Sequence, residues 1–387
     1  MLPTASPHHR WYLALWIAGS ILALCVVLAS TGFYILYSNP AYAATFADNV
    51  LRPTLGDQRT IALEGELFGI EDSINKATNK QASPSQYGLA VATVAITTPS
   101  PTSIPTISAV PTPTPTLSLN LPAIKPVVDT STPLPNEGIW SEISGTPLLT
   151  TYIRTDPTRA YSVVNLVYIP MSTLGIDAVA GTKYPGGSAG PGKVPDTIQQ
   201  AGRLVAAFNG GFQEKDGNYG MIADGTTYVP LRLNLPALEI YADGHAELVS
   251  DYTGTLPAGV ISVRQNGPLL VKNGVVAPLT SQGINLWAGT ATGDYVTWRS
   301  GLGITASGDL VYAVGASLTP TALAEALQLA GSVSAMQLDI NAYWVRFMVY
   351  QPSGSSYTWS PLTNALTNDG SAYLTGYEKD FFYLYTK

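Results

Sequence analysis

The chain has 387 residues, only 12% of them charged, and a formal net charge of -7 at neutral pH. Nucleic-acid binding needs a clustered excess of lysine and arginine to neutralise phosphates, so this charge balance excludes a nucleic-acid partner. Cys25 is the single cysteine. Intrachain disulfides, cysteine-ligated zinc and a cysteine nucleophile are therefore excluded from everything that follows it.

The first predicted element is a membrane anchor. The run from Trp11 to Tyr37 carries no charge and is longer than the roughly 20 apolar residues that cross a bilayer core. Arg10 precedes it and the next basic residue is Arg52, which favours a cytoplasmic tail of residues 1–10 and an outward C-terminus. We therefore expect a single-pass protein of the cell membrane with an extracytoplasmic C-terminal domain. Cleavage as a signal peptide near residues 41–44 is the alternative.

Two segments separate this anchor from the C-terminal domain. Residues 42–80 mix apolar and charged side chains at helical spacing, which predicts a juxtamembrane helical segment. Residues 82–137 are rich in proline, threonine and serine, and no charge occurs between Lys80 and Lys125. Such a composition predicts a disordered linker. We expect it to act as a stalk that reaches on the order of 150 Å.

Residues 138–387 contain short apolar runs separated by turn dipeptides, which predicts a globular, β-rich domain. Leu238–Tyr241 and Ala246–Val249 flank an Asp-Gly turn, and Leu269–Val271 leads through Asn-Gly to Val275–Val276. Both patterns are typical of β-hairpins.

Two helices are predicted in this domain, at residues 196–202 and at Pro320–Ala330. The second has a threonine before it as N-cap, a proline at its first position and a glycine after it as a stop. Strand-like runs at Leu310–Val314 and Ala335–Leu338 flank it. A strand–helix–strand unit favours a partly parallel sheet, so the predicted fold class is α+β, with a mixed, β-rich sheet and a few helices.

Three segments of the domain carry candidate site residues. Asn209, Gly210 and Gly211 follow a buried-strand run, and two glycines allow backbone N–H groups to approach an anion or a sugar closely. A type I′ turn is the alternative. Arg299 is a lone cation in an apolar run, so it needs a carboxylate or a ligand phosphate as partner.

The third segment supplies the best candidate for acid/base or nucleophilic chemistry, Asp339. It ends the strand that follows the second helix, and ligands gather at such strand ends. Capping of the next turn by Asp339 and Asn341 is the alternative. The domain has one histidine, His245, on a predicted hairpin turn, where we expect it at the surface. We predict no cofactor and no metal ligands.

In this order, the segments resemble the phosphodiester glycosidase family from about residue 160 to the C-terminus. That family has an Asn-Gly-Gly-Phe segment, an arginine before a Gly-Ile strand, a helix opened by Leu-Thr, and a Leu-Asp-Gly-Gly segment. The matching positions here are Asn209–Phe212, Arg299 with Gly303-Ile304, Leu318-Thr319 and Leu338-Asp339. The ending Lys379-Asp380-Phe381-Phe382 is similar to the family's Arg-Asp-Phe-Phe. Ile340-Asn341 departs from the family's glycines.

The resemblance implies hydrolysis of a sugar-1-phosphodiester, with a carbohydrate or sugar phosphate as the partner molecule. In this hypothesis Asp339 is nucleophile or general base, and Arg299 with the glycine amides stabilises the leaving group. Asn209 and Asn341 orient sugar hydroxyls. The aromatic candidates for stacking on the sugar are Trp298, Tyr343 and Trp344, with core packing as their alternative role. A non-catalytic glycan-binding module or a scaffold on a stalk are the competing functions.

Overall fold

The computed structural model describes residues 31, 46–78, 80–89, 121–128, 132–278, 296–366 and 369–387. The predicted anchor at residues 11–37, apart from Thr31, lies outside these ranges, and so does the middle of the predicted stalk. Among the residues that are described, no helix combines the length and the apolar character needed to span a bilayer.

The chain divides into two compact units, Met1–Thr60 and Ile61–Lys387. The described part of the first unit is helical, with a π-helical turn at Ala47–Leu51 and α3 at Arg52–Leu55. Helix α4 spans Asp57–Ala77, so most of it belongs to the second unit. The remaining helices of the second unit are short, apart from α6: they are α5 (Asp196–Gln200), α6 (Pro320–Leu329), α7 (Ala372–Thr375) and the 3₁₀ turns Pro84–Gln86 and Glu214–Asp216.

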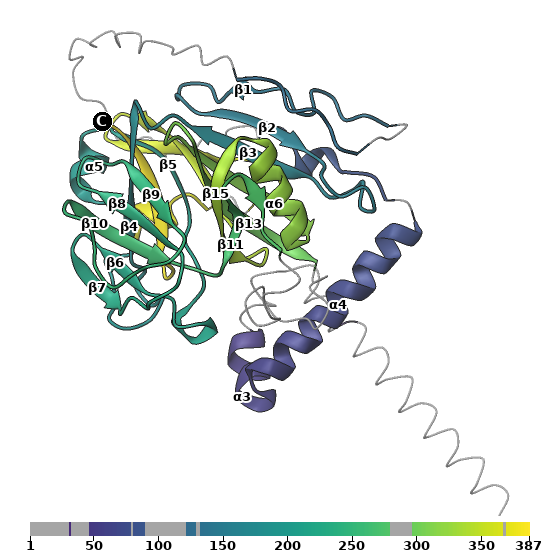
Figure 1. The fold of residues 1–387 in the computed structure, drawn as a ribbon, viewed down its shortest axis with the longest axis horizontal. Helices are drawn as coiled ribbons and strands as arrows, with labels where there is room; N and C mark the ends of the chain where they lie inside the picture. The colour runs from purple at the N-terminus through teal and green to yellow at the C-terminus, as the bar shows by residue number, and fades with distance from the viewer. Residues whose placement is uncertain are drawn as a thin grey trace, which may run out of the picture. The chain divides into compact units, whose positions relative to one another are not determined.

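The described strands of the second unit form three sheets (Figure 1). The eight-stranded sheet has the order β1 (Ser141–Glu142), β2 (Leu149–Ile153), β3 (Val164–Ile169), β14 (Leu310–Leu318), β13 (Thr297–Thr305), β15 (Ser332–Ile340), β11 (Leu269–Lys272), β12 (Val275–Val276). One five-stranded sheet has the order β17 (Ser356–Pro361), β16 (Phe347–Ser353), β5 (Leu204–Asn209), β18 (Phe381–Thr386), β4 (Leu174–Val179). The other has the order β7 (Thr226–Val229), β6 (Met221–Ala223), β10 (Val260–Gln265), β8 (Ala237–Tyr241), β9 (Ala246–Val249). The predicted β-rich class with few helices is confirmed.

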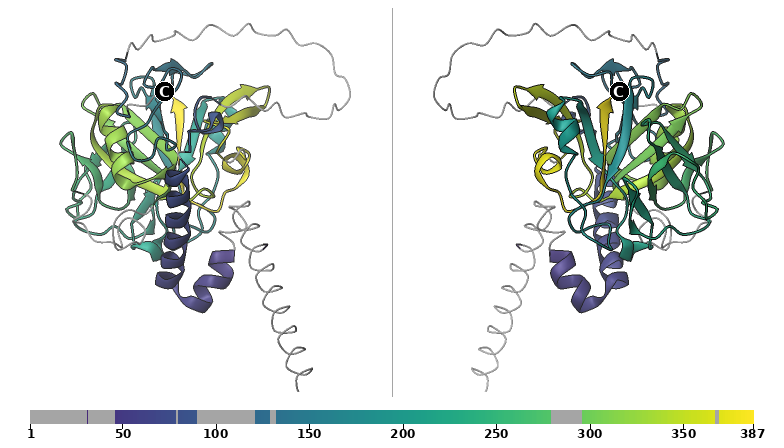
Figure 2. Two further views of the ribbon diagram at one scale, coloured as in Figure 1. Left: turned by 90° about the vertical axis from the view of Figure 1, so that its right-hand side faces the viewer. Right: turned by 90° about the vertical axis from the view of Figure 1, so that its left-hand side faces the viewer.

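The central strands of the eight-stranded sheet are buried on both faces. Leu302 and Leu338 contribute to a core cluster that also contains Phe208 of β5, and the Phe208 and Phe347 rings stack with their centroids 5.7 Å apart. On the opposite face α6 packs its Leu323 against a second cluster. Figure 2 shows α6 outside the eight-stranded sheet, on the side away from β18. The sheet is therefore the middle layer, and its strand ends approach the β5–β18 sheet.

Local sequence signals are confirmed where they act over a few residues. Strands β8 and β9 pair antiparallel, with Ile240 opposite Ala246, and β11 and β12 pair with Lys272 opposite Val275. The second hairpin turns through Asn273, at a φ of 54°, a conformation that asparagine tolerates. Helix α6 begins as predicted, because Oγ1 of Thr319 accepts a hydrogen bond of 3.1 Å from the Ala322 amide.

The predicted parallel pairing is wrong. Every strand pair among the described residues is antiparallel. Strands β14 and β15, on either side of α6, do run in the same direction, but β13 lies between them and pairs antiparallel with both. The crossover therefore skips one strand, an arrangement that the strand–helix–strand pattern alone does not reveal.

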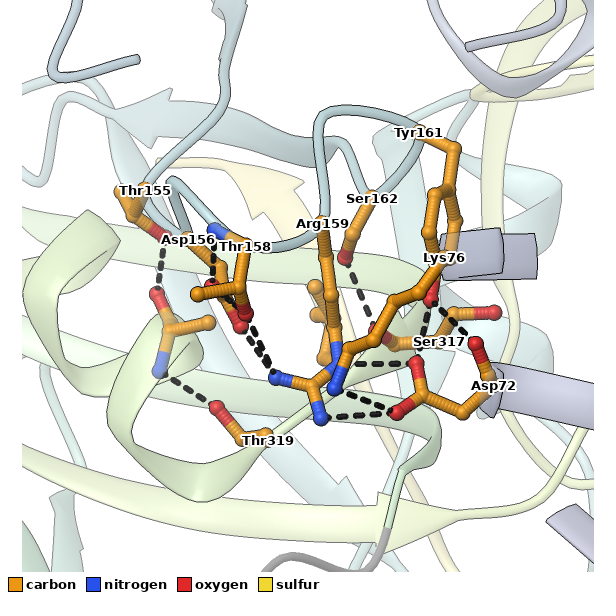
Figure 3. Close-up of polar contacts among 12 residues, drawn as sticks. Asp72, Lys76, Thr155, Asp156, Thr158, Arg159, Tyr161, Ser162, Ser317 and Thr319 are labelled. Atoms are coloured by element: carbon orange, nitrogen blue, oxygen red, sulfur yellow. Dashed lines mark hydrogen bonds and ion pairs between the residues drawn. The ribbon is translucent and has the colours of Figure 1, made fainter. Parts of the chain in front are cut away.

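Helix α4 and the segment after it, at the N-terminal edge of the predicted linker 82–137, pack on the second unit. Asp72 of α4 accepts two hydrogen bonds of 2.8 Å from Arg159 (Figure 3). The Gln86 carbonyl accepts a hydrogen bond from Asn165, and the Tyr87 ring lies 4.8 Å from that of Tyr152.

The other end of the undescribed stretch is held by the same domain. Backbone N–H of Ile124 donates to the Gly138 carbonyl, and Gly138 in turn donates to Tyr152 of β2. Residues on both sides of 90–120 therefore contact one unit, in agreement with its extent, Ile61–Lys387. The disordered linker over residues 82–137 stays a prediction, because its middle lies outside the described residues.

One cross-strand pair provides a test of the core. Glu239 on β8 lies opposite Glu247 on β9, is only 3% exposed, and its Oε2 has no hydrogen-bond partner among the described residues. Burial, and then the charge of Glu247, raise the pKa of Glu239 above the usual 4.5. The folded protein therefore binds this proton more tightly than the unfolded chain does, and stability falls as pH rises through the folded pKa.

We expect Glu239→Gln to raise the free energy of unfolding by about 1 kcal/mol at pH 7. The gain should disappear at pH 4, where the parent carboxyl is also protonated. Denaturant unfolding at both pH values measures it, with Glu247→Gln as the control that removes the repulsion and leaves the buried carboxyl. An equal gain at both pH values would contradict this account.

Candidate functional site

The ends of β5, β13 and β15 meet at Asn209. Its Nδ2 donates to Oγ of Ser300 at 2.9 Å, and Ser300 donates to the Asp339 carbonyl at 2.7 Å. The Asp339 amide donates to the Gly210 carbonyl at 3.0 Å, and Oδ1 of Asn209 accepts from the Tyr312 hydroxyl at 2.8 Å. The three segments predicted to converge are therefore neighbours in space.

The two glycines allow Asp380 to approach the chain closely. A Cβ on Gly210 would lie 1.9 Å from Oδ2 of Asp380. The Gly210 amide donates to the Asp380 carbonyl, and the Gly211 amide donates to Oδ2 at 3.1 Å. Neither glycine has the positive φ of a type I′ turn, and β5 pairs with β16 and β18 and forms no hairpin here. The turn alternative is thus wrong, and the amides proposed for substrate already have an acceptor.

Asp380 also forms a buried ion pair that sequence reasoning missed. Its Oδ2 accepts from Nε of Arg264 at 2.8 Å, and both side chains are buried. Arg264 donates further to the carbonyls of Gln265 and Phe212, each at 2.6 Å. The available signal was the lone arginine in the apolar run that forms β10.

Asp339 forms a second buried ion pair. The residue is 4% exposed; Oδ2 pairs with Nζ of Lys379, and Oδ1 accepts from the Ile340 amide at 3.0 Å. The sequence indicated Lys379 only as the first residue of the ending Lys379-Asp380-Phe381-Phe382, and not as a partner of Asp339. Its Nζ lies 4.6 Å from the centre of the Trp344 ring. Asp339 therefore contacts its own turn, as the capping alternative supposed, and it also neutralises a buried cation.

Arg299 is placed differently from Asp339. It lies next to Ser300 on β13 and is fully buried. Its Nε donates to the Leu318 carbonyl and its Nη1 to Oε1 of Gln337, both at 2.9 Å. These hydrogen bonds connect β13 to its neighbours β14 and β15. The guanidinium is directed along these two bonds, whereas the Asp339 carboxylate is directed to Lys379.

Residues 202–339 match the family described as phosphodiester glycosidase. The predicted resemblance to the phosphodiester glycosidases is confirmed. The matched range begins just before β5 and ends at Asp339, so it contains the three segments that meet at Asn209. A search of curated proteins gives no match.

The solved structures that match share little sequence with this chain. The zebrafish N-acetylglucosamine-1-phosphodiester alpha-N-acetylglucosaminidase catalytic domain, auto-inhibited by its pro-peptide, has 13% identity and a TM-score of 0.42, over 64% of this chain and 86% of that one. A hypothetical protein from Synechocystis has 12% identity and a TM-score of 0.36, over 62% of each chain. A putative exported protein from Burkholderia pseudomallei has 12% identity and a TM-score of 0.29, over 58% of this chain and 74% of that one.

Where the phosphodiester glycosidases more typically have glycines, Asn341 keeps a backbone that glycine favours. Its φ is 81°, in the left-handed region that asparagine tolerates better than most residues. Its Oδ1 accepts from the Tyr343 amide at 3.0 Å, and its own amide donates to Trp298. The departure from the glycosidase pattern therefore preserves the local turn. The predicted sugar contact of Asn341 stays a prediction.

A cluster of aromatic rings reaches the Asp339–Lys379 pair through Trp344. Tyr343 and Trp344 have ring centroids 4.5 Å apart, and Tyr184 meets Trp344 edge-on at 6.0 Å. All three side chains are half-buried. The edges and faces of such rings are suited to sugar contacts. Trp298, by contrast, packs against the core.

His245 lies on the turn between β8 and β9. Its side chain is exposed and contacts Asp243 of the same hairpin turn, so the predicted surface position is confirmed. Within the described ranges, no group of three or more histidine, cysteine, aspartate or glutamate side chains is arranged to hold a metal ion.

Proposed function

We propose that the second unit is a hydrolase that cleaves a sugar-1-phosphodiester or a related glycosidic bond. The observation that carries this proposal is the meeting of Asn209, Ser300 and Asp339 at three strand ends, beside the buried Lys379 cation. The family match over the same segments supports the reaction class.

In the proposed reaction the bond between sugar C1 and the phosphate oxygen breaks, and its electron pair stays with the phosphate. That leaving group is a weak base, so charge stabilisation matters more than protonation. Asp339 stabilises the developing positive charge at C1, either as nucleophile or as the general base that takes the proton of the attacking water. The water oxygen ends on C1.

In this mechanism the ion pair with Lys379 must open before the Asp339 carboxylate can face the sugar. When a phosphodiester enters, its negative oxygen can replace Oδ2 as the partner of Nζ, and Asp339 then faces the sugar. Trp344 covers Nζ at 4.6 Å, so substrate entry requires this ring to move or to stack on the sugar. Arg299 is proposed to stabilise the leaving group, and its bonds to Leu318 and Gln337 also hold β13 in register.

The wider setting completes the proposal. Residues 11–37 are proposed as a membrane anchor that leaves the hydrolase outside the cytoplasm, with an envelope glycan as its substrate. The uncharged run from Trp11 to Tyr37 supports the anchor.

A glycan-binding module without turnover is the second candidate. It is favoured by one observation: the Gly210 and Gly211 amides are engaged by Asp380, and the Asp339 carboxylate by Lys379. Incubating the full chain with a methyl sugar-1-phosphodiester and with envelope glycans separates the two. Release of free sugar supports the hydrolase, and retention without release supports the binding module. Neither release nor retention would reject both.

A further inference from the structure

Four buried cations of the second unit form ion pairs with carboxylates, whereas Arg346 forms none among the described residues. Four buried pairs are described: Arg154–Glu137, Arg159–Asp72, Arg264–Asp380 and Lys379–Asp339. Arg346 is equally buried, at 4% exposure. Among the described residues, no carboxylate forms an ion pair with it.

The contacts of Arg346 leave its guanidinium poorly satisfied. Its Nη1 donates to the Asp369 carbonyl at 3.5 Å, the long limit of a hydrogen bond. Its Nε has no partner in the described part of the chain. The guanidinium carbon lies 4.6 Å from the Tyr377 ring centre and 5.9 Å from that of Tyr343. Ring faces stabilise a cation only partly.

Two further donors lie beside this guanidinium. Tyr373 and Tyr377 are buried, and neither hydroxyl has a hydrogen-bond partner among the described residues. Their ring centroids are 5.1 Å apart, and both interact electrostatically with Arg346. Burial raises the pKa of both phenols, so they are protonated donors at neutral pH.

Three carboxylates act on these donors through space, those of Asp369, Glu378 and Asp380, and none of them forms an ion pair with Arg346 among the described residues. Asp380, which acts on Tyr373, is paired with Arg264. Asp369 is exposed, and its Oδ1 accepts from the Ser371 hydroxyl. Burying a cation without a counter-charge is costly, and so is leaving buried donors without an acceptor.

We propose that Arg346, together with the Tyr373 and Tyr377 hydroxyls, binds a phosphate-class anion. A guanidinium and two hydroxyls that can donate match the oxygens of a phosphate, and Arg is suited to bind them through more than one N–H. The sequence indicated Arg299 as the arginine that could bind a phosphate. Arg299 already donates to Leu318 and Gln337.

The anion site is connected to Asp339 through two short segments. In one segment Trp344 and Arg346 are two residues apart, and in the other Tyr377 and Lys379 are two residues apart. The Trp344 ring contacts Lys379, and the Arg346 guanidinium contacts the Tyr377 ring. We assign the anion to the phosphodiester of the substrate, or to a charged group next to it. That assignment rests on the proposed function, whereas anion binding itself does not.

Titration of the full chain with inorganic phosphate tests the site without any turnover. At low ionic strength we expect phosphate to raise the unfolding temperature of the parent. Arg346→Gln should weaken phosphate binding at least tenfold, and Tyr377→Phe, which keeps the ring and removes the hydroxyl, several-fold. Arg232→Gln, at an exposed arginine, is the matched control and should bind as the parent does. Arg346→Lys keeps the charge and should recover part of the affinity.

An unfolding temperature of the parent that does not respond to phosphate would overturn the proposal. Unchanged affinity in Arg346→Gln, with a parent-like circular dichroism spectrum, would do the same. If turnover exists, Arg346→Gln should raise KM for a charged sugar phosphodiester by a larger factor than it raises KM for a neutral aryl glycoside. Phosphate binding without any turnover would support this site and reject the hydrolase. Turnover, together with phosphate binding that does not change in Arg346→Gln, would support the hydrolase and reject this site.

Discussion

Asp339→Asn is expected to lower the turnover number on a sugar-1-phosphodiester by about 10²- to 10⁴-fold, the usual contribution of a general acid/base residue. Asparagine has nearly the same shape and can still accept the Ile340 amide through Oδ1. It lacks the negative charge and the basicity that the proposed mechanism assigns to the Asp339 carboxylate. KM should change much less than the turnover number, because the sugar contacts are kept.

The control for this variant must separate chemistry from folding, because the substitution removes the carboxylate that pairs with Lys379. Asp339→Asn combined with Lys379→Met removes both charges of the pair and should be folded but inactive. Asp251→Asn, at an exposed aspartate, should keep full activity. A parent-like rate, within about threefold, in folded Asp339→Asn would exclude this carboxylate from the chemistry.

Asp72→Ala is expected to lower the free energy of unfolding by about 3 kcal/mol. The substitution breaks a pair in which both side chains are buried (Figure 3). Arg159 keeps Asp156 as a partner at 2.6 Å, which places the loss at the lower end of the range for buried pairs. We also expect faster hydrogen exchange in α4, because Asp72 is the residue that fixes this helix to Arg159 and Tyr161.

The same pair should give the stability a pH dependence of known sign. Burial alone would raise the pKa of Asp72, but hydrogen bonds from Arg159, Tyr161 and Lys76 hold it at about 2, below the usual 3.8. A carboxyl with a lowered folded pKa contributes stability above its unfolded pKa and loses it as pH falls toward the folded value. The difference between parent and Asp72→Ala should therefore be full at pH 6 and shrink between about pH 4 and pH 2.

Denaturant unfolding across that pH range measures the effect. Glu66→Gln, at an exposed residue of the same helix, is the matched control and should change stability by less than about 0.5 kcal/mol. An equally small loss in Asp72→Ala would mean that α4 does not depend on this pair.

The features that sequence predicted well depend on neighbours along the chain. The turn at Asn273 and the cap at Thr319 are set by a few residues whose conformational preferences are strong, and both are found. Asn209 and Asp339 were identified because they end strands, and strand ends collect polar groups. Their hydrogen-bond connection through Ser300 followed from no local signal.

What the sequence missed depends on pairing over long distances. Arg264 and Asp380 are separated by 116 residues along the chain, and no periodicity indicates that they meet. Placing β13 between β14 and β15 is likewise a choice among sheet orders that have the same local patterns. The burial of Asp72 could not be predicted for the same reason. Its partner Arg159 follows the proline-rich segment in the sequence, whereas Asp72 precedes it.

The contacts at both ends of the proline-rich segment also determine whether the two fragments stay associated after a protease cuts this segment. A cut between residues 90 and 120 would sever the polypeptide, yet Asp72 would still hold Arg159 and Gln86 would still hold Asn165. The two fragments would travel together in a native gel and part only in denaturant. Separation of the C-terminal fragment from the N-terminal one would thus need a break in the packing of α4 as well as a break in the chain.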